Sequence, residues 1–153
     1  MRKIVVLIAA SGLLTVSGLL PVSAGAHEGQ KNPEVRYRHF VMESMSNDFA
    51  AMAMIFKNEV DRPDEMQVLA RSLAESASLI AGLFPAGSEG ASALPLIWEE
   101  PERVQEASRE SAATAAALAE AAAGDDRAAL GKAFAAAGAA CKGCHERYKA
   151  EDE

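Results

Sequence analysis

The chain has 153 residues, with 22 acidic and 15 basic side chains and a formal net charge of −7. Nucleic acid is recognised through a basic surface, so this composition excludes nucleic acid as a partner and favours a protein partner with a positive patch. The length suits one compact domain preceded by a short leader.

The N-terminus has the pattern of a secretory signal peptide. A short positive start precedes an uncharged apolar run over residues 4–20, and residues 24–26 (Ala-Gly-Ala) fit a cleavage site. The alternative, an uncleaved anchor helix, is disfavoured by this cleavage signal. We therefore expect residues 1–26 to be removed and residues 27–153 to form a periplasmic protein, with no later segment apolar for long enough to span a membrane.

From residue 33 onward the sequence predicts helices, and no segment shows the alternation typical of strands. Apolar side chains recur every third or fourth residue over residues 33–56, which places them on one buried stripe of a helix. Residues 58–65 (NEVDRPDE) interrupt this pattern, and a second helix is expected from Pro63 to Leu83. The first stripe consists of Val35, Arg38, Met42, Met45, Phe49, Met52 and Phe56, and the second of Met66, Leu69, Leu73, Ser76, Ile80 and Leu83.

Residues 84–102 contain three prolines and two glycines and are expected to form a long connection. A third helix follows and ends at Gly124, and Asp125 or Asp126 is expected to cap a fourth. Amphipathic helices joined by short turns and one long crossover are typical of an antiparallel four-helix bundle, so we predict an all-α fold. The third stripe is Val104, Ser108, Ser111, Ala115, Leu118 and Ala122, and the fourth is Leu130, Phe134, Ala137, Cys141, Cys144 and Tyr148.

The only two cysteines stand in the segment ACKGCHERYKA and are followed directly by a histidine. On a helix, Cys141, Cys144 and His145 share one face. Such a pair serves a redox disulfide, half of a zinc site or covalent haem attachment. A disulfide across two residues removes little chain entropy, and a thioredoxin-like dithiol normally stands at the start of a helix in a mixed fold. Zinc would need further ligands, and His27 and His39 are distant in the sequence.

The Cys-x-x-Cys-His pattern is the signature of c-type haem attachment, in which both thiols bond to the haem and the imidazole binds its iron. The inward stripes of the third and fourth helices carry mostly alanine and serine, which would leave a cavity unless a flat group filled it. We therefore predict one covalent haem c, attached at Cys141 and Cys144, with His145 as an iron ligand.

These features resemble the class II c-type cytochromes, the cytochrome c′ family, over the whole mature chain. The matching segments are YRHFVM, FPAGSEG with LPLIW in the long connection, and GAACKGCHERYK. The resemblance implies that Arg38 contacts a haem propionate, whereas the alternative is an arginine that reaches solvent. It also places His39 and Ser92 beside the haem, although relatives often have aspartate at the position of Ser92. Lys149 stands where several relatives carry arginine.

Met42 matches the family residue above the open face of the haem, and the resemblance implies two functions that differ at this residue. In low-spin electron carriers methionine binds the iron opposite the histidine, whereas in five-coordinate members the iron is free to bind nitric oxide or carbon monoxide. A third hypothesis, without haem, is a helical dithiol or interaction module.

Partners and catalysis complete the expectations. The resemblance implies redox partner proteins and a homodimer formed through the first two helices, to which the methionines between Met52 and Met66 would contribute. No serine–histidine–acid set or carboxylate pair is recognisable, so we expect no enzymatic activity.

Overall fold

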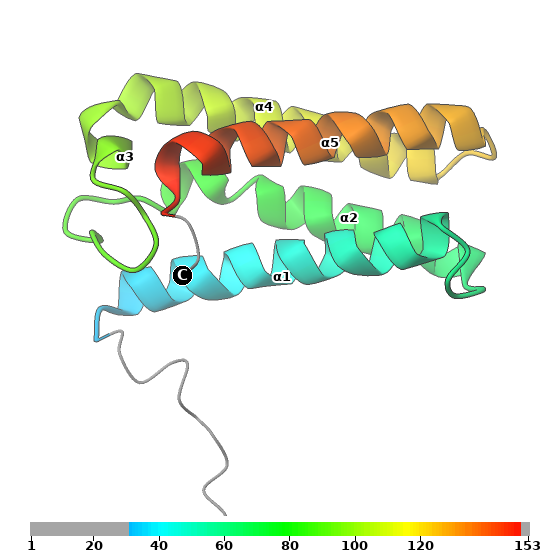
Figure 1. Ribbon diagram of the computed structural model, residues 1–153, viewed down its shortest axis with the longest axis horizontal. Coiled ribbons are helices and arrows are strands. Elements are labelled where there is room, and N and C mark those ends of the chain that lie inside the picture. Colours follow the sequence, from blue (N-terminus) through cyan, green and yellow to red (C-terminus); the bar gives the residue numbers. More distant parts are fainter. Residues whose placement is uncertain (1–30, 151–153) are drawn as a thin grey trace, which may run out of the picture.

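The computed structural model describes residues 31–150, so the predicted signal peptide lies outside the described residues and the boundary at residue 26 stays a prediction. Four long helices lie side by side, and successive ones run in opposite directions (Figure 1). They are α1 (Pro33–Phe56), α2 (Met66–Ala77), α4 (Pro101–Ala122) and α5 (Arg127–Tyr148). The predicted antiparallel four-helix bundle is confirmed. Within this described range, no helix is long and apolar enough to cross a membrane.

Local sequence signals set the ends of these helices. Asn32 caps α1 by accepting a 3.0 Å hydrogen bond from the backbone N–H of Glu34, and proline occupies the first helical position. At the start of α5, the Asp126 carboxylate accepts hydrogen bonds from the backbone N–H groups of Ala128 (2.8 Å) and Ala129 (3.0 Å). Asp126, of the two predicted candidates, is therefore the cap.

The second helix is shorter and more irregular than predicted. A 3₁₀ turn over Pro63–Glu65 precedes α2, and another over Ile80–Gly82 follows it. The break coincides with Ser78, whose hydroxyl donates a 2.6 Å hydrogen bond to the carbonyl of Glu75 and so competes with the helical pattern. The buried stripe also differs from the predicted one, because Ala70 and Ala77 are buried while Leu69 and Ser76 are half-buried.

The long connection is also more structured than predicted. It contains a short helix, α3 (Leu96–Glu99), and α4 already begins at Pro101, where proline suits the first helical turn. Two backbone hydrogen bonds tie the connection to the end of α5, one from Leu94 to Tyr148 (2.9 Å) and one from Ala150 to Ser92 (2.8 Å). The crossover therefore lies at the end of the bundle that carries the cysteine motif (Figure 1).

Packing is uneven around the bundle. Over the described residues α1 packs closely on α2, α2 on α4 and α4 on α5, whereas the backbones of α1 and α5 stay further apart. Aromatic rings span part of this gap, since Phe134 of α5 stacks on Phe49 at a centroid distance of 4.2 Å and on Phe56 at 6.0 Å. The remainder of the gap, toward the cysteine motif, is a cavity.

Two of the three methionines expected at a dimer contact are buried. Met52 is 0% exposed and Met66 is 6% exposed, and both belong to the main hydrophobic core. Met52 and Met66 fill space inside one bundle and cannot line a contact between two copies, so the expectation is wrong for these two residues. Met54, which is 44% exposed, is the one methionine between them that reaches the surface.

Candidate haem site

A cavity of about 330 Å³ lies between α1 and α5, and we call it the first cavity. Cys141, Cys144 and His145 all contribute to its wall from the last two turns of α5. The spacing of three and four residues thus brings the whole motif to one face, as predicted from helix geometry. Met42 and Phe49 line it from the side of α1.

Small side chains create this space. Ala77 of α2 and Ser111 and Ala115 of α4 form part of the cavity wall, where leucine or phenylalanine would fill a bundle interior. Each of these three residues is buried. The alanine and serine side chains were predicted to leave room for a flat group, and the structure has a cavity at this place. Its walls are mainly apolar.

The two thiols form no disulfide with each other, and both are half-buried. Burial raises the pKa of Cys141, and burial together with the neighbouring Cys141 raises the pKa of Cys144. A dithiol used for redox exchange needs a lowered pKa, so the environment does not suit that chemistry. Within residues 31–150 no three His, Cys, Asp or Glu side chains gather as zinc ligands would.

A second cavity, of about 350 Å³, adjoins the first, and Met42, Ser46, Cys144 and His145 line both. The other predicted site residues come together at this second cavity. Arg38, His39, Ser92 and Lys149 all contribute to its wall.

These four residues differ in exposure and in their contacts. His39 and Ser92 are exposed, and His39 lies 3.7 Å from a carboxylate oxygen of Glu43. The carbonyl of Ser92 accepts a hydrogen bond from the backbone N–H of Ala150, which follows α5. The second cavity is thus closed on one side by the crossover and on another by α1.

Arg38 is buried, with only 6% of its surface exposed, so it does not reach solvent. Its guanidinium donates hydrogen bonds to the carbonyls of Leu83 (3.3 Å), Ser88 (3.0 Å) and Gly90 (3.1 Å) in the crossover. It also lies over the rings of Phe84 and Trp98, at 5.2 and 5.7 Å from their centroids, where cation–π attraction stabilises it. Burial lowers the pKa of Arg38, and the negative charge of Glu89 opposes this effect.

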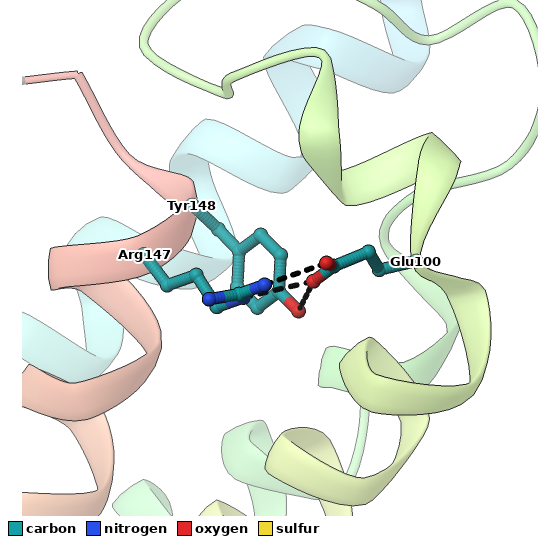
Figure 2. A network of polar contacts seen from close by, with 3 residues as sticks. All are labelled: Glu100, Arg147 and Tyr148. Atoms are coloured by element: carbon teal, nitrogen blue, oxygen red, sulfur yellow. Dashed lines mark hydrogen bonds and ion pairs between the residues drawn. The ribbon is translucent and has the colours of Figure 1, made fainter.

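A cluster that was not predicted joins the start of α4 to the end of α5 (Figure 2). Arg147 donates to Glu100 through Nε at 2.8 Å and through a terminal nitrogen, and the hydroxyl of Tyr148 donates to the same carboxylate at 2.8 Å. The hydrogen bonds from Arg147 and then from Tyr148 lower the pKa of Glu100 from 4.5 to about 2. Of these three residues, the sequence analysis had singled out only Tyr148, as a member of the fourth buried stripe. Glu100 is 47 and 48 positions from its two partners, so no local sequence pattern indicates these hydrogen bonds.

The donor set and the cavity suit a haem. Two thiols one helical turn apart and an adjacent imidazole face one mainly apolar space. Arg38 and Lys149 line the adjoining second cavity, where they would neutralise carboxylates. A guanidinium has five N–H donors, so the contacts of Arg38 to backbone carbonyls leave it capacity for a carboxylate.

Comparisons with known proteins agree with this fit. Residues 33–149 match the family described as Cytochrome C′. The chain is 29% identical over 154 residues to cytochrome c′ of Rhodospirillum rubrum, covering 99% of this chain and 100% of that one. It is 38% identical over 122 residues to cytochrome c-554 of Cereibacter sphaeroides, covering 75% of this chain and 79% of that one.

Solved structures have the same fold. A ferrous variant of cytochrome c′ from Alcaligenes xylosoxidans with bound nitric oxide superposes with a TM-score of 0.72 at 27% identity, over 78% of this chain and 94% of that chain. A variant from the same organism with bound carbon monoxide gives the same TM-score. The predictions of one covalent haem c and of a non-enzymatic haem protein are confirmed by the family match. The chain belongs to the cytochrome c′ family.

Proposed function

We propose that this protein is an exported electron carrier in which His145 and Met42 bind the haem iron from opposite sides. One observation carries this proposal. Met42 on α1 and His145 on α5 belong to the two helices that enclose the first cavity, and both residues also line the second. A thioether from one wall and an imidazole from the other form the Met/His ligand set of an electron-transfer haem.

The other site residues hold and orient the group. Cys141 and Cys144 attach it covalently, and Arg38 and Lys149 neutralise its carboxylates at the second cavity. When bound, the haem iron supplies reversible one-electron transfer, and methionine ligation raises its reduction potential. The walls of the first cavity around Met42 and His145 are mainly apolar.

Export and partner choice follow from the sequence. The signal peptide pattern over residues 1–26 supports a periplasmic location, where a soluble carrier meets its redox partners. The acidic excess of the chain supports electrostatic steering toward partners with a positive patch. Raising the ionic strength should therefore slow electron exchange with such partners, because salt screens the attraction.

The test is the absorption spectrum of the ferric and ferrous protein beside Met42→Ala, with Met54→Ala as a matched control on the exposed side of the same helix. We expect the wild type and Met54→Ala to be low-spin. Met42→Ala should become high-spin and bind carbon monoxide readily, because the sixth position is then open. A wild type that is already high-spin would contradict methionine ligation.

The second candidate function is gas binding by a five-coordinate iron. It is favoured by the similar structures that carry nitric oxide and carbon monoxide. In this case Met42 is an apolar wall residue beside the bound gas, comparable to Phe49 in the same cavity. A high-spin ferric spectrum with Met42 present would support this function.

Homodimer formation through the first two helices is a further proposal. It is supported by exposed apolar side chains on these helices. Tyr37 is 53% exposed and Phe40 is 46% exposed on α1, and Val68 is 60% exposed on α2. These side chains lie on the outer surface of the bundle, where a second copy could cover them.

A further inference from the structure

Two glycines of α5 face two phenylalanine rings of α1. A methyl group placed on Gly138 would lie 3.2 Å from Cζ of Phe49, and one placed on Gly131 would lie 3.2 Å from Cζ of Phe56. Both distances are shorter than the favourable carbon–carbon separation of about 3.5–4.0 Å. At either position a side chain would therefore push the ring, or the helix that carries it, away from α5.

The contact between Phe49 and Gly138 lies next to the proposed iron ligands. Met42 precedes Phe49 by one heptad on α1, and His145 follows Gly138 by one heptad on α5. Because the two helices run in opposite directions, the same pairing continued toward the cysteine motif brings Met42 opposite His145. The spacing of the helices at Phe49 and Gly138 is thus transmitted to Met42 over two helical turns.

The ring of Phe49 packs against both Phe134 and Gly138 of α5. It stacks on Phe134 at a centroid distance of 4.2 Å with the rings inclined by 27°, and it forms part of the wall of the first cavity beside Gly138. The backbones of α1 and α5 are not closely packed, and this aromatic contact bridges the two helices beside the cavity.

The residue type at position 138 is otherwise unfavourable. Glycine is a poor helix former compared with alanine, and Gly138 lies within a run of alanines inside α5. Helix propensity alone would therefore favour alanine here as well. The close approach of Phe49 gives a physical reason for the missing side chain.

We infer that Gly138 is a positioning residue for Met42. Its missing side chain lets Phe49 close against α5, and this closure brings α1 near enough for the Met42 sulfur to reach the iron held by His145. The inference rests on the proposed ligation by Met42. It predicts that a single methyl group, placed outside the ligand set, weakens the sixth ligand.

The experiment compares three glycine-to-alanine variants of the haem-loaded protein by ferric spectrum, carbon monoxide association rate of the ferrous form and thermal unfolding. Gly138→Ala should lower the ratio of methionine-bound to methionine-free iron about tenfold and speed carbon monoxide binding, because α1 is displaced. Gly131→Ala makes the same contact one heptad further from the iron, so it should destabilise the fold with a smaller spectral change. Gly82→Ala, in the 3₁₀ turn after α2 and outside both cavities, adds a methyl that meets no atom within 4 Å and should leave the spectrum unchanged.

A second-site change separates positioning from general damage. Phe49→Leu in the Gly138→Ala background gives the methyl group room, and it should restore the low-spin fraction that Gly138→Ala loses. A low-spin wild type whose Gly138→Ala variant keeps both its spectrum and its carbon monoxide rate would contradict this inference alone. A wild type that is high-spin would contradict methionine ligation and, with it, the positioning of Met42.

Discussion

The hydroxyl of Tyr148 donates a 2.8 Å hydrogen bond to the carboxylate of Glu100, although the two residues are 48 positions apart. Tyr148 is only 4% exposed, and it follows the cysteine motif within the last turn of α5. Arg147 closes on the same carboxylate, so the end of α5 is fixed to the start of α4 beside the proposed iron ligand (Figure 2).

The first prediction concerns Glu100 and acid. Its folded-state pKa of about 2 lies below the usual 4.5, so its stabilising effect is fully present above pH 4.5 and is lost as the pH falls toward 2. Glu100→Gln should lower the free energy of unfolding at pH 7 and flatten its dependence on pH between 4.5 and 2. Urea titrations across this range measure both effects. Glu99→Gln, at an exposed neighbouring position, should follow the wild-type curve, and equal slopes for all three proteins would contradict the role of Glu100.

The second prediction concerns covalent attachment. Replacing Cys141 and Cys144 together by alanine should give a chain that releases its haem on denaturation, because no thioether remains. Mass spectrometry of the denatured protein should show the chain plus one haem for the wild type and the chain alone for the double variant. Haem that stays with the denatured double variant would contradict attachment at these residues.

The third prediction concerns Arg38. Arg38→Leu should destabilise the fold by about 2–3 kcal/mol, because the carbonyls of Ser88 and Gly90 lose a charged donor in a buried setting. It should also shift the reduction potential if Arg38 neutralises a propionate. Arg36→Leu, at an exposed position of the same helix, is the control for both measurements. An unchanged free energy of unfolding in Arg38→Leu would mean that Arg38 does not stabilise the crossover.

The fourth prediction concerns self-association. If the outer face of α1 forms a dimer contact, Phe40→Glu should convert the dimer to a monomer at micromolar concentration, since a charge would be buried without a partner. Ala116→Glu, at an exposed position of α4, should leave the dimer intact. Sedimentation velocity distinguishes the two forms, and a wild type that is monomeric would exclude the dimer.

The sequence predicted the parts of the molecule whose determinants are local. The cysteine motif shares one face because its spacing matches a helical turn, and Asp126 caps α5 through bonds to residues that follow it directly. The buried stripes identified the bundle, and Arg38 stood out because a charged residue is rare on such a stripe.

Features that depend on distant partners were not predictable from local patterns. The hydrogen bonds of Arg38 reach residues 45 to 52 positions away in the sequence, and those of Glu100 reach residues 47 and 48 positions away. The repeat of Phe49 and Phe56 at the same interval as Gly138 and Gly131 was visible in the sequence. That each phenylalanine contacts one of these glycines could be inferred only from the antiparallel pairing of α1 with α5 in the structure.

The inward orientation of the two thiols has a consequence for the order of events during biogenesis. Cys141 and Cys144 face the cavity between α1 and α5, and Phe49, which stacks on Phe134, also lines it. A haem that fills this cavity would lie between α1 and α5, so attachment is easier while α1 is not yet packed against α5. We therefore expect the thioether bonds to form before the final closure of α1.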